Sequence, residues 1–180
     1  FKKSNRQDNK QHCQKILEGI NKFDNYTANR AIWELVQNAR DLSKNAEIDF
    51  ILNETSLCFS HKGIPFNYET FTSLIKQVSS SEKENSVSAG QFGTGFMTTH
   101  KFSRLIKISG SLEITKGHYA KIENFELNRT ANNISSMIEA MTEQLSFANH
   151  LKEGNLNDFP EDKTSFIYEL DEEHFPAAKQ

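Results

Sequence analysis

The sequence has little cysteine, no long apolar run and no excess of charge of one sign. Its two cysteines, Cys13 and Cys58, belong to no Cys-x-x-Cys pair, so they define neither a disulfide framework nor a zinc site. No apolar run approaches the ~20 residues of a membrane helix, and the basic, polar residues 1–11 contain no signal-peptide core. The 21 Lys and Arg against 24 Asp and Glu give a formal net charge of −3, which argues against a polybasic surface for nucleic acid or membrane. We expect a cytoplasmic protein with reduced thiols, no membrane attachment and no indicated nucleic-acid partner.

Length and composition predict one core. The chain has 180 residues, of which 36% are hydrophobic, and it shows no internal repeat. We therefore expect residues 1–180 to form a single domain. The chain begins at Phe1 rather than Met, so we also expect a piece of a longer protein, whose remaining domains would be partners.

Apolar periodicity predicts helices alternating with strands. The predicted helices are residues 11–20, 27–42, 71–78, 96–102 and 132–151. The predicted strands are residues 48–52, 57–59, 105–108, 119–127 and 166–170. Between them, residues 79–89 are polar and small, which predicts a mobile loop.

The helix at residues 27–42 places Glu34, Asn38 and Asp41 at i, i+4 and i+7, on one face. Such a stripe is usually the solvated side of an amphipathic helix. The rest of this helix is apolar, however, which predicts burial on nearly all sides and a cavity lined by the three polar groups.

A glycine cluster precedes the helix predicted at residues 96–102. It reads Gly90, Gln91, Phe92, Gly93, Thr94, Gly95 and Phe96. Glycines at a helix start allow successive backbone N–H groups to converge on a phosphate, although flexible turns use the same residues. The order is neither that of a Rossmann motif nor that of a Walker loop.

Taken together, ELVQNARD, HKGIPF and GQFGTGF resemble, in this order, the GHKL superfamily of ATP-binding domains, which includes gyrase, heat-shock chaperones, histidine kinases and MutL. Glu34, Asn38 and Asp41 match its asparagine box, and Gly90–Phe96 match its second glycine box at every position. Thr164 is similar to a threonine that helps to hold adenine, with Lys163 where glycine is usual.

The first glycine box departs from the family pattern. Where the family has an aspartate that accepts a hydrogen bond from the adenine amino group, this chain has His61. A neutral imidazole offers one acceptor nitrogen, but a protonated one offers none. Gly63 keeps the turn position and Pro65 replaces a glycine, in a string similar to that of sacsin-like ATPase domains. The alternative is that His61 merely ends a strand and that nucleotide binding has been lost.

The resemblance implies an α+β fold: a two-layer sandwich with a mixed, mostly antiparallel sheet, helices on one face and a mobile ATP lid at residues 79–89. It implies ATP or ADP with Mg²⁺ as cofactors. Asn38 would be the Mg²⁺ ligand and Glu34 the base that activates water. Asp41, His61, Gly63 and Thr164 would face the base and sugar, and Gly90–Phe96 would bind the phosphates.

Three functions remain open. The first is an ATP-hydrolysing domain of a larger, chaperone-like protein that forms a nucleotide-dependent dimer. The second is a histidine-kinase-type phosphotransfer domain, against which Glu34 argues, because such kinases must avoid hydrolysis. The third is a nucleotide-binding interaction module without turnover, for which His61, Pro65 and Lys163 argue.

Other residues give weaker signals. The six histidines form no HExxH motif, so they are expected at the surface or in packing. Met137 and Met141 are spaced as core residues of a helix. The serines at 79–81 are expected in a loop rather than as nucleophiles.

Overall fold

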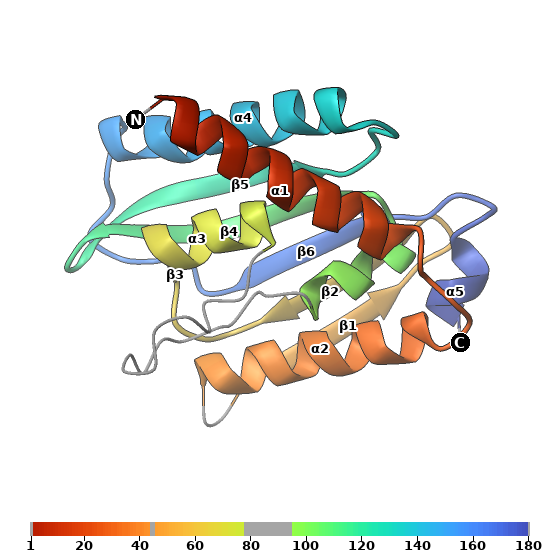
Figure 1. The fold of residues 1–180 in the computed structure, drawn as a ribbon. Helices are drawn as coiled ribbons and strands as arrows, with labels where there is room; N and C mark the ends of the chain where they lie inside the picture. Colours follow the sequence, from red (N-terminus) through yellow and green to blue (C-terminus); the bar gives the residue numbers. More distant parts are fainter. Residues whose placement is uncertain (1, 44–45, 78–94, 180) are drawn as a thin grey trace.

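The computed structural model describes residues 2–43, 46–77 and 95–179, which form one mixed sheet and its helices (Figure 1). The helices are α1 Lys2–Ile20, α2 Thr27–Leu42, α3 Tyr68–Lys76, α4 Ile134–His150 and α5 Phe175–Lys179, with the 3₁₀ helices η1 Phe96–Lys101 and η2 Leu151–Glu153. The strands are β1 Ile48–Leu52, β2 Ser56–His61, β3 Phe66–Asn67, β4 Leu105–Thr115, β5 His118–Asn128 and β6 Thr164–Glu169.

The six strands lie in the order β1-β2-β6-β4-β3, and β5 pairs with β4. Every pair is antiparallel except β3 with β4. The fold is therefore α+β with a mostly antiparallel sheet, as predicted. In Figure 1, α1, α2 and α3 lie in front of the sheet, and α4 lies above β5.

The strand sequences explain which face of the sheet is covered. In β2, Leu57, Phe59 and His61 are buried, and the residues between them are half-buried. In β6, Thr164, Phe166 and Tyr168 follow the same alternation. Because successive side chains point to opposite faces, these residues pack under the helices and the other face stays open.

Local chemistry fixes several element ends. The Asn67 side chain accepts a hydrogen bond from the Thr70 N–H at 2.8 Å, and the Thr70 hydroxyl oxygen accepts one from the Asn67 N–H at 3.0 Å, which caps α3. The helix ends at Gln77, whose φ of 50° is left-handed. Asp24 accepts from the Tyr26 N–H and from the Thr27 hydroxyl just before α2.

Two interpretations of the sequence need revision. The first helix begins at Lys2 rather than near residue 11. The prediction that α2 is buried on nearly all sides is wrong, because Trp33 is 64% exposed and only one side of the helix faces the core.

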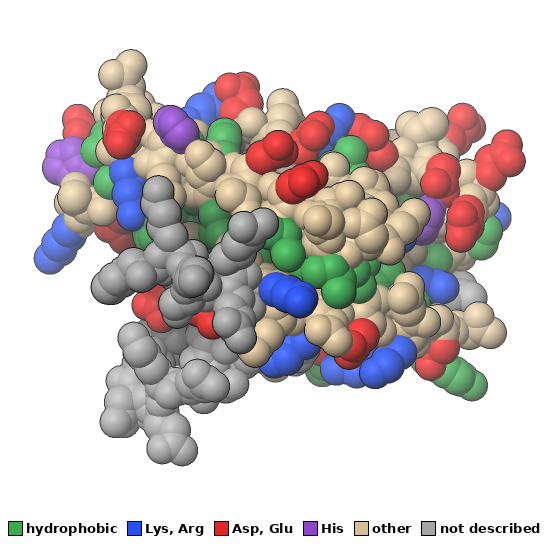
Figure 2. All heavy atoms as spheres, turned by 45° about the horizontal axis from the view of Figure 1, so that its top comes forward, with side chains coloured by type: hydrophobic (Ala, Val, Ile, Leu, Met, Phe, Trp, Pro, Cys, Tyr) green, Lys and Arg blue, Asp and Glu red, His purple; other side chains and the backbone are tan. Residues whose placement is uncertain are grey.

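Acidic and basic side chains are both spread over the face of the molecule that Figure 2 shows, which is consistent with the small net charge of the chain.

The predicted core residues are confirmed. Met137 and Met141 are fully buried on α4. Cys13 is buried, Cys58 is half-buried, and both are free thiols. The serines at 79–81 and the predicted lid at 79–89 lie outside the described residues.

Candidate functional site

Asn38 lies on the buried face of α2, in the row of Ala31, Leu35 and Leu42. It is 5% exposed, and its Nδ2 atom has no hydrogen-bond partner among the described residues. A buried polar group without a partner costs about 1–3 kcal/mol of stability. A helix that packs only to stabilise the fold would place an apolar side chain here, so Asn38 is a candidate ligand-binding group.

Glu34, one helical turn earlier, contacts the last glycine of the cluster. A Cβ atom on Gly95 would lie 1.9 Å from the Glu34 Oε2 atom and 2.3 Å from its carboxyl carbon. Since the φ of Gly95 is −64°, the requirement for glycine comes from this contact and not from the backbone conformation. The structure thus brings the asparagine box and the end of the second glycine box together.

Arg30 holds the other side of the Glu34 carboxylate. Its Nε atom lies 3.5 Å from Glu34 Oε1, and the Glu34 side chain is 21% exposed. Glu34 is therefore a half-buried, accessible carboxylate with two neighbours, Arg30 and Gly95. It can accept a proton from a water molecule that reaches this surface.

Asp41 lies on the exposed side of α2. It lines a shallow hollow of 550 Å³ with Trp33, Val36, Gln37 and Arg40. The sequence places Glu34, Asn38 and Asp41 within one helical face, but the structure separates them by burial: Asn38 is buried, Glu34 is half-buried and Asp41 is exposed.

His61 ends β2, where it pairs with Ile48 and with Thr164. His61 is 1% exposed, and its ring packs against one side of a pair of aromatic rings, with centroids 5.6 Å from Phe59 and 6.3 Å from Phe166. Burial lowers the pKa of His61, so the imidazole is neutral at neutral pH. Its Nδ1 atom has no hydrogen-bond partner among the described residues.

Gly63 brings the end of α2 close to His61. A Cβ atom on Gly63 would lie 3.2 Å from Leu42 Cβ and 3.4 Å from His61 Nδ1, and the Ile64 N–H donates to the Leu42 carbonyl at 3.4 Å. Thr164, 7% exposed, is the ladder partner of His61. His61, Gly63 and Thr164 are thus neighbours, as their assignment to one subsite requires.

Phe166 connects this subsite with the glycine box. The Phe166 ring is stacked against the His61 ring, with 6.3 Å between their centroids. The centroid of Phe166 also lies 5.6 Å from that of Phe96, which is fully buried. The predicted phosphate-binding residues Gly90, Gln91, Phe92, Gly93 and Thr94 lie outside the described residues.

Comparisons with family models, curated proteins and solved structures gave no match to this chain. The functional argument therefore rests on the residues themselves. Within residues 2–43, 46–77 and 95–179, no group of three or more His, Cys, Asp or Glu side chains is placed to hold a metal ion. In the same part of the chain, no helix is both long and apolar enough to cross a membrane.

Several contacts at this site have no signal in the sequence. The overlap of Gly95 with Glu34 joins residues 61 positions apart, and Phe166 lies in a strand that reads as ordinary core. Arg30, in contrast, is four residues before Glu34, a spacing at which helical ion pairs form, so this contact does have a signal in the sequence.

Proposed function

We propose that the chain is an ATP-binding, Mg²⁺-dependent ATPase domain of a larger, chaperone-like protein with the GHKL fold. The observation that carries the proposal is the contact between the Glu34 carboxylate and Gly95, beside the buried amide of Asn38. It joins the two motifs on which the resemblance depends, in a sheet-and-helix fold of the expected class. The remaining domains of the parent protein and a nucleotide-dependent dimer are the proposed partners.

We assign Asn38 Oδ1 as the protein's ligand to Mg²⁺, and the partnerless Nδ2 donor would then face an acceptor such as a phosphate oxygen. This hard cation keeps several waters and takes phosphate oxygens as its other ligands, so one amide oxygen from the protein is sufficient.

Glu34 is the base of the proposed hydrolysis. Its carboxylate is accessible, and it accepts a proton from the attacking water, while backbone N–H groups of residues 90–96 bind the phosphates. The ion pair with Arg30 limits the directions that the carboxylate can take. Catalysis comes from positioning and charge stabilisation, since phosphoryl transfer requires little covalent chemistry from the protein.

His61 takes the place of the base-reading aspartate. Because its imidazole is neutral, one ring nitrogen is an acceptor, which suits the amino group of adenine. Thr164 lies next to it on β6 and adds a hydroxyl. Asp41, exposed on α2, is assigned to the sugar side.

A nucleotide-binding interaction module without turnover is the second candidate. The observation that favours it is the burial of His61 against Phe59 and Phe166, since a residue that is 1% exposed packs as a core residue does. The two candidates differ in what Glu34 does, because only the ATPase needs its carboxylate.

The test is calorimetric titration with ADP and with a non-hydrolysable ATP analogue, each with and without Mg²⁺, followed by an ATPase assay. We expect Asn38→Ala to lose Mg²⁺-dependent binding. We expect Glu34→Ala to keep binding and lose hydrolysis by roughly 10²-fold or more. Asn29→Ala, at an exposed position of the same helix outside the hollow that Asp41 lines, is the matched control and should change neither.

Each outcome decides between the candidates. Binding without measurable turnover in the wild-type chain supports the module. Normal turnover in Glu34→Ala removes Glu34 from the mechanism. No binding in the wild type, with binding gained in His61→Asp, rejects both candidates for this chain and leaves a nucleotide fold without its ligand.

A further inference from the structure

We propose that a second pocket, at the far end of η1 from Gly95, binds a small organic anion. This α5 pocket is a cavity of 360 Å³ between η1, the turn after α1 and α5. Its walls combine the cationic side chains of Lys101 and Arg104 with an apolar side formed by Ile20, Phe23, Pro176 and Ala177. A ligand with a phosphate or carboxylate head and a compact apolar body matches both halves.

Neither cation of the α5 pocket has an anionic partner among the residues that the structure describes. Arg104 donates to the Asn132 Oδ1 atom at 3.2 Å and to the Ala131 carbonyl at 3.4 Å, both neutral acceptors, and its buried Nε atom has no partner among the described residues. Lys101 forms no ion pair with any residue that the structure describes. A guanidinium group has five N–H donors in a planar fork, so Arg104 keeps donors for an oxyanion.

The interior behind the pocket is also positively charged. Arg129 is fully buried, and its hydrogen bonds go to the Asn128 carbonyl, the Gln144 Oε1 atom and the Ile75 carbonyl, again neutral acceptors. Its positive charge is therefore not balanced by a carboxylate in the described part of the chain.

His100, on the pocket wall, responds to this charge. Burial first, and then the charges of Arg129 and Arg104, lower its pKa to about 3. The ring is held by the Ser103 carbonyl at 3.2 Å from Nδ1 and by the Gln77 side chain at 2.6 Å from Nε2. His100 is thus a neutral wall, and an anion is the group that would balance the charge around it.

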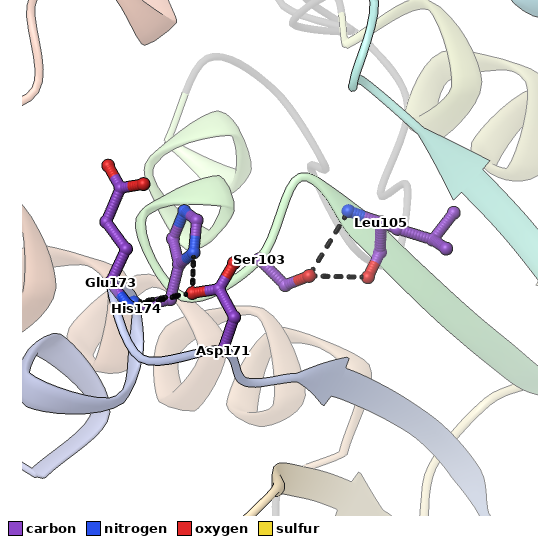
Figure 3. Close-up of polar contacts among 5 residues, drawn as sticks. All are labelled: Ser103, Leu105, Asp171, Glu173 and His174. Atoms are coloured by element: carbon purple, nitrogen blue, oxygen red, sulfur yellow. Dashed lines mark hydrogen bonds and ion pairs between the residues drawn. The ribbon is translucent and has the colours of Figure 1, made fainter.

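Two acidic residues, Asp171 and Glu173, lie near the α5 pocket, and neither forms an ion pair with Lys101 or Arg104. Asp171 accepts hydrogen bonds from the His174 ring at 2.5 Å and from the His174 N–H at 2.8 Å, so it holds the turn before α5 (Figure 3). Glu173 lines the pocket, and its side chain is exposed to solvent. The Ser103 hydroxyl is turned to the Leu105 backbone, so these residues form no Ser-His-Asp triad.

Three probes separate the head from the body of the ligand: phenyl phosphate, benzoate and neutral benzyl alcohol. They are titrated into the chain and followed by calorimetry and by amide NMR shifts. We expect the two anions to saturate with a dissociation constant on the order of 1 mM, and benzyl alcohol not to saturate. The stronger of the two anions identifies the preferred head group.

Charge-removing variants locate the binding. Lys101→Gln and Arg104→Gln should each weaken anion binding by roughly tenfold or more. Lys116→Gln and Arg40→Gln remove the same charges from exposed positions elsewhere and should have no effect. Asn38→Ala should also have none, because the α5 pocket shares no residue with the proposed nucleotide site, so the two proposals fail independently.

Three results would overturn the proposal: no saturation by either anion up to roughly 10 mM, equal binding of benzyl alcohol, or undiminished binding in both charge variants. If Arg104→Gln lowers the melting temperature, its loss of anion binding does not test the pocket. The test then depends on Lys101→Gln and on Ala177→Phe, which fills the cavity, provided that each of these variants keeps the wild-type melting temperature. Retention of anion binding in both of these variants counts against the pocket.

Discussion

At the scale of single residues, the missing side chain at Gly95 determines where the Glu34 carboxylate can lie. A Cβ atom there would overlap the end of a flexible side chain rather than the backbone. A substitution would therefore displace the carboxylate at low cost to the fold. A substitution at Gly95 should therefore change ATP hydrolysis much more than it changes the free energy of unfolding.

We predict that Gly95→Ala changes the free energy of unfolding by less than about 1 kcal/mol and reduces ATP hydrolysis by roughly 10²-fold, because ~1 Å of displacement at a catalytic group has an effect of this size. Urea titration and an ATPase assay measure the two effects. Gly154→Ala is the control, since the nearest atom to its Cβ would be at an ordinary 3.7 Å. Full activity in Gly95→Ala would show that the position of Glu34 does not matter.

His100 gives a second prediction at this scale, on pH. Its pKa is about 3 in the folded chain and near 6.5 when unfolded, so the unfolded state binds the proton first. Its contribution to stability is complete above about pH 6.5 and is lost as the pH falls toward 3. Burial lowers the pKa of His61 in the same direction.

Urea titrations between about pH 6 and pH 4 should therefore show that the free energy of unfolding decreases as the pH is lowered. In His100→Gln, the slope should be smaller by nearly one proton, or about 1.4 kcal/mol per pH unit. Equal slopes in the wild type and in His100→Gln would mean that His100 is protonated in the folded state over this pH range.

At the scale of elements, Arg129 joins the end of α3, the end of β5 and the middle of α4. Its guanidinium donates to the Ile75 carbonyl, the Asn128 carbonyl and Gln144 Oε1. Three pieces of the chain thus share one fully buried group. Desolvation lowers its pKa to about 10, so it remains charged at neutral pH.

We predict that Arg129→Ala lowers the free energy of unfolding by about 3–5 kcal/mol, because it leaves a cavity and removes the guanidinium donor from two buried acceptors, Gln144 Oε1 and the Ile75 carbonyl. The exposed Arg40→Ala should cost less than about 0.5 kcal/mol. Denaturant titration distinguishes the two. A small loss in Arg129→Ala would indicate that water replaces the guanidinium in the interior.

The elements also show how far the sequence predicts this fold. Alternation in Leu57–Phe59 and in residues 166–170 predicted strands where β2 and β6 lie. The strand predicted at residues 105–108 continues to Thr115, because Gly110 and Ser111 are paired with β5 despite their low strand propensity. Residues 2–10 of α1 were missed, since polar residues carry no apolar period.

The candidate site was predicted as residue types but not as positions. The asparagine-box spacing identified Glu34 and Asn38. Asn38 lies on the buried face of α2, and Glu34 lies against Gly95 at the start of η1. Their different burial depends on how α2 is rotated against its neighbours, which spacing alone does not fix. Because spacing does not fix this rotation, the sequence also did not predict that Trp33 and Asp41 are exposed.

At the scale of the whole molecule, the sheet has one covered and one open face, and the two proposed sites lie at opposite ends of η1. Gly95 begins this 3₁₀ helix and Lys101 ends it. With six residues and a rise of about 2 Å each, the ends are roughly 12 Å apart. The two ligands can therefore bind without direct contact.

The strand order has a consequence for the behaviour of the protein at high concentration. Among the described residues, β1 pairs only with β2, and Phe50, Ile51 and Leu52 are 38%, 54% and 43% exposed. A strand with one free edge and apolar side chains is a template for aggregation between copies. We predict that Ile51→Lys raises the concentration at which the chain precipitates, measured by light scattering, whereas Lys152→Gln does not. Substitutions in β1 are therefore the first to make when the protein is to be stored or crystallised at high concentration.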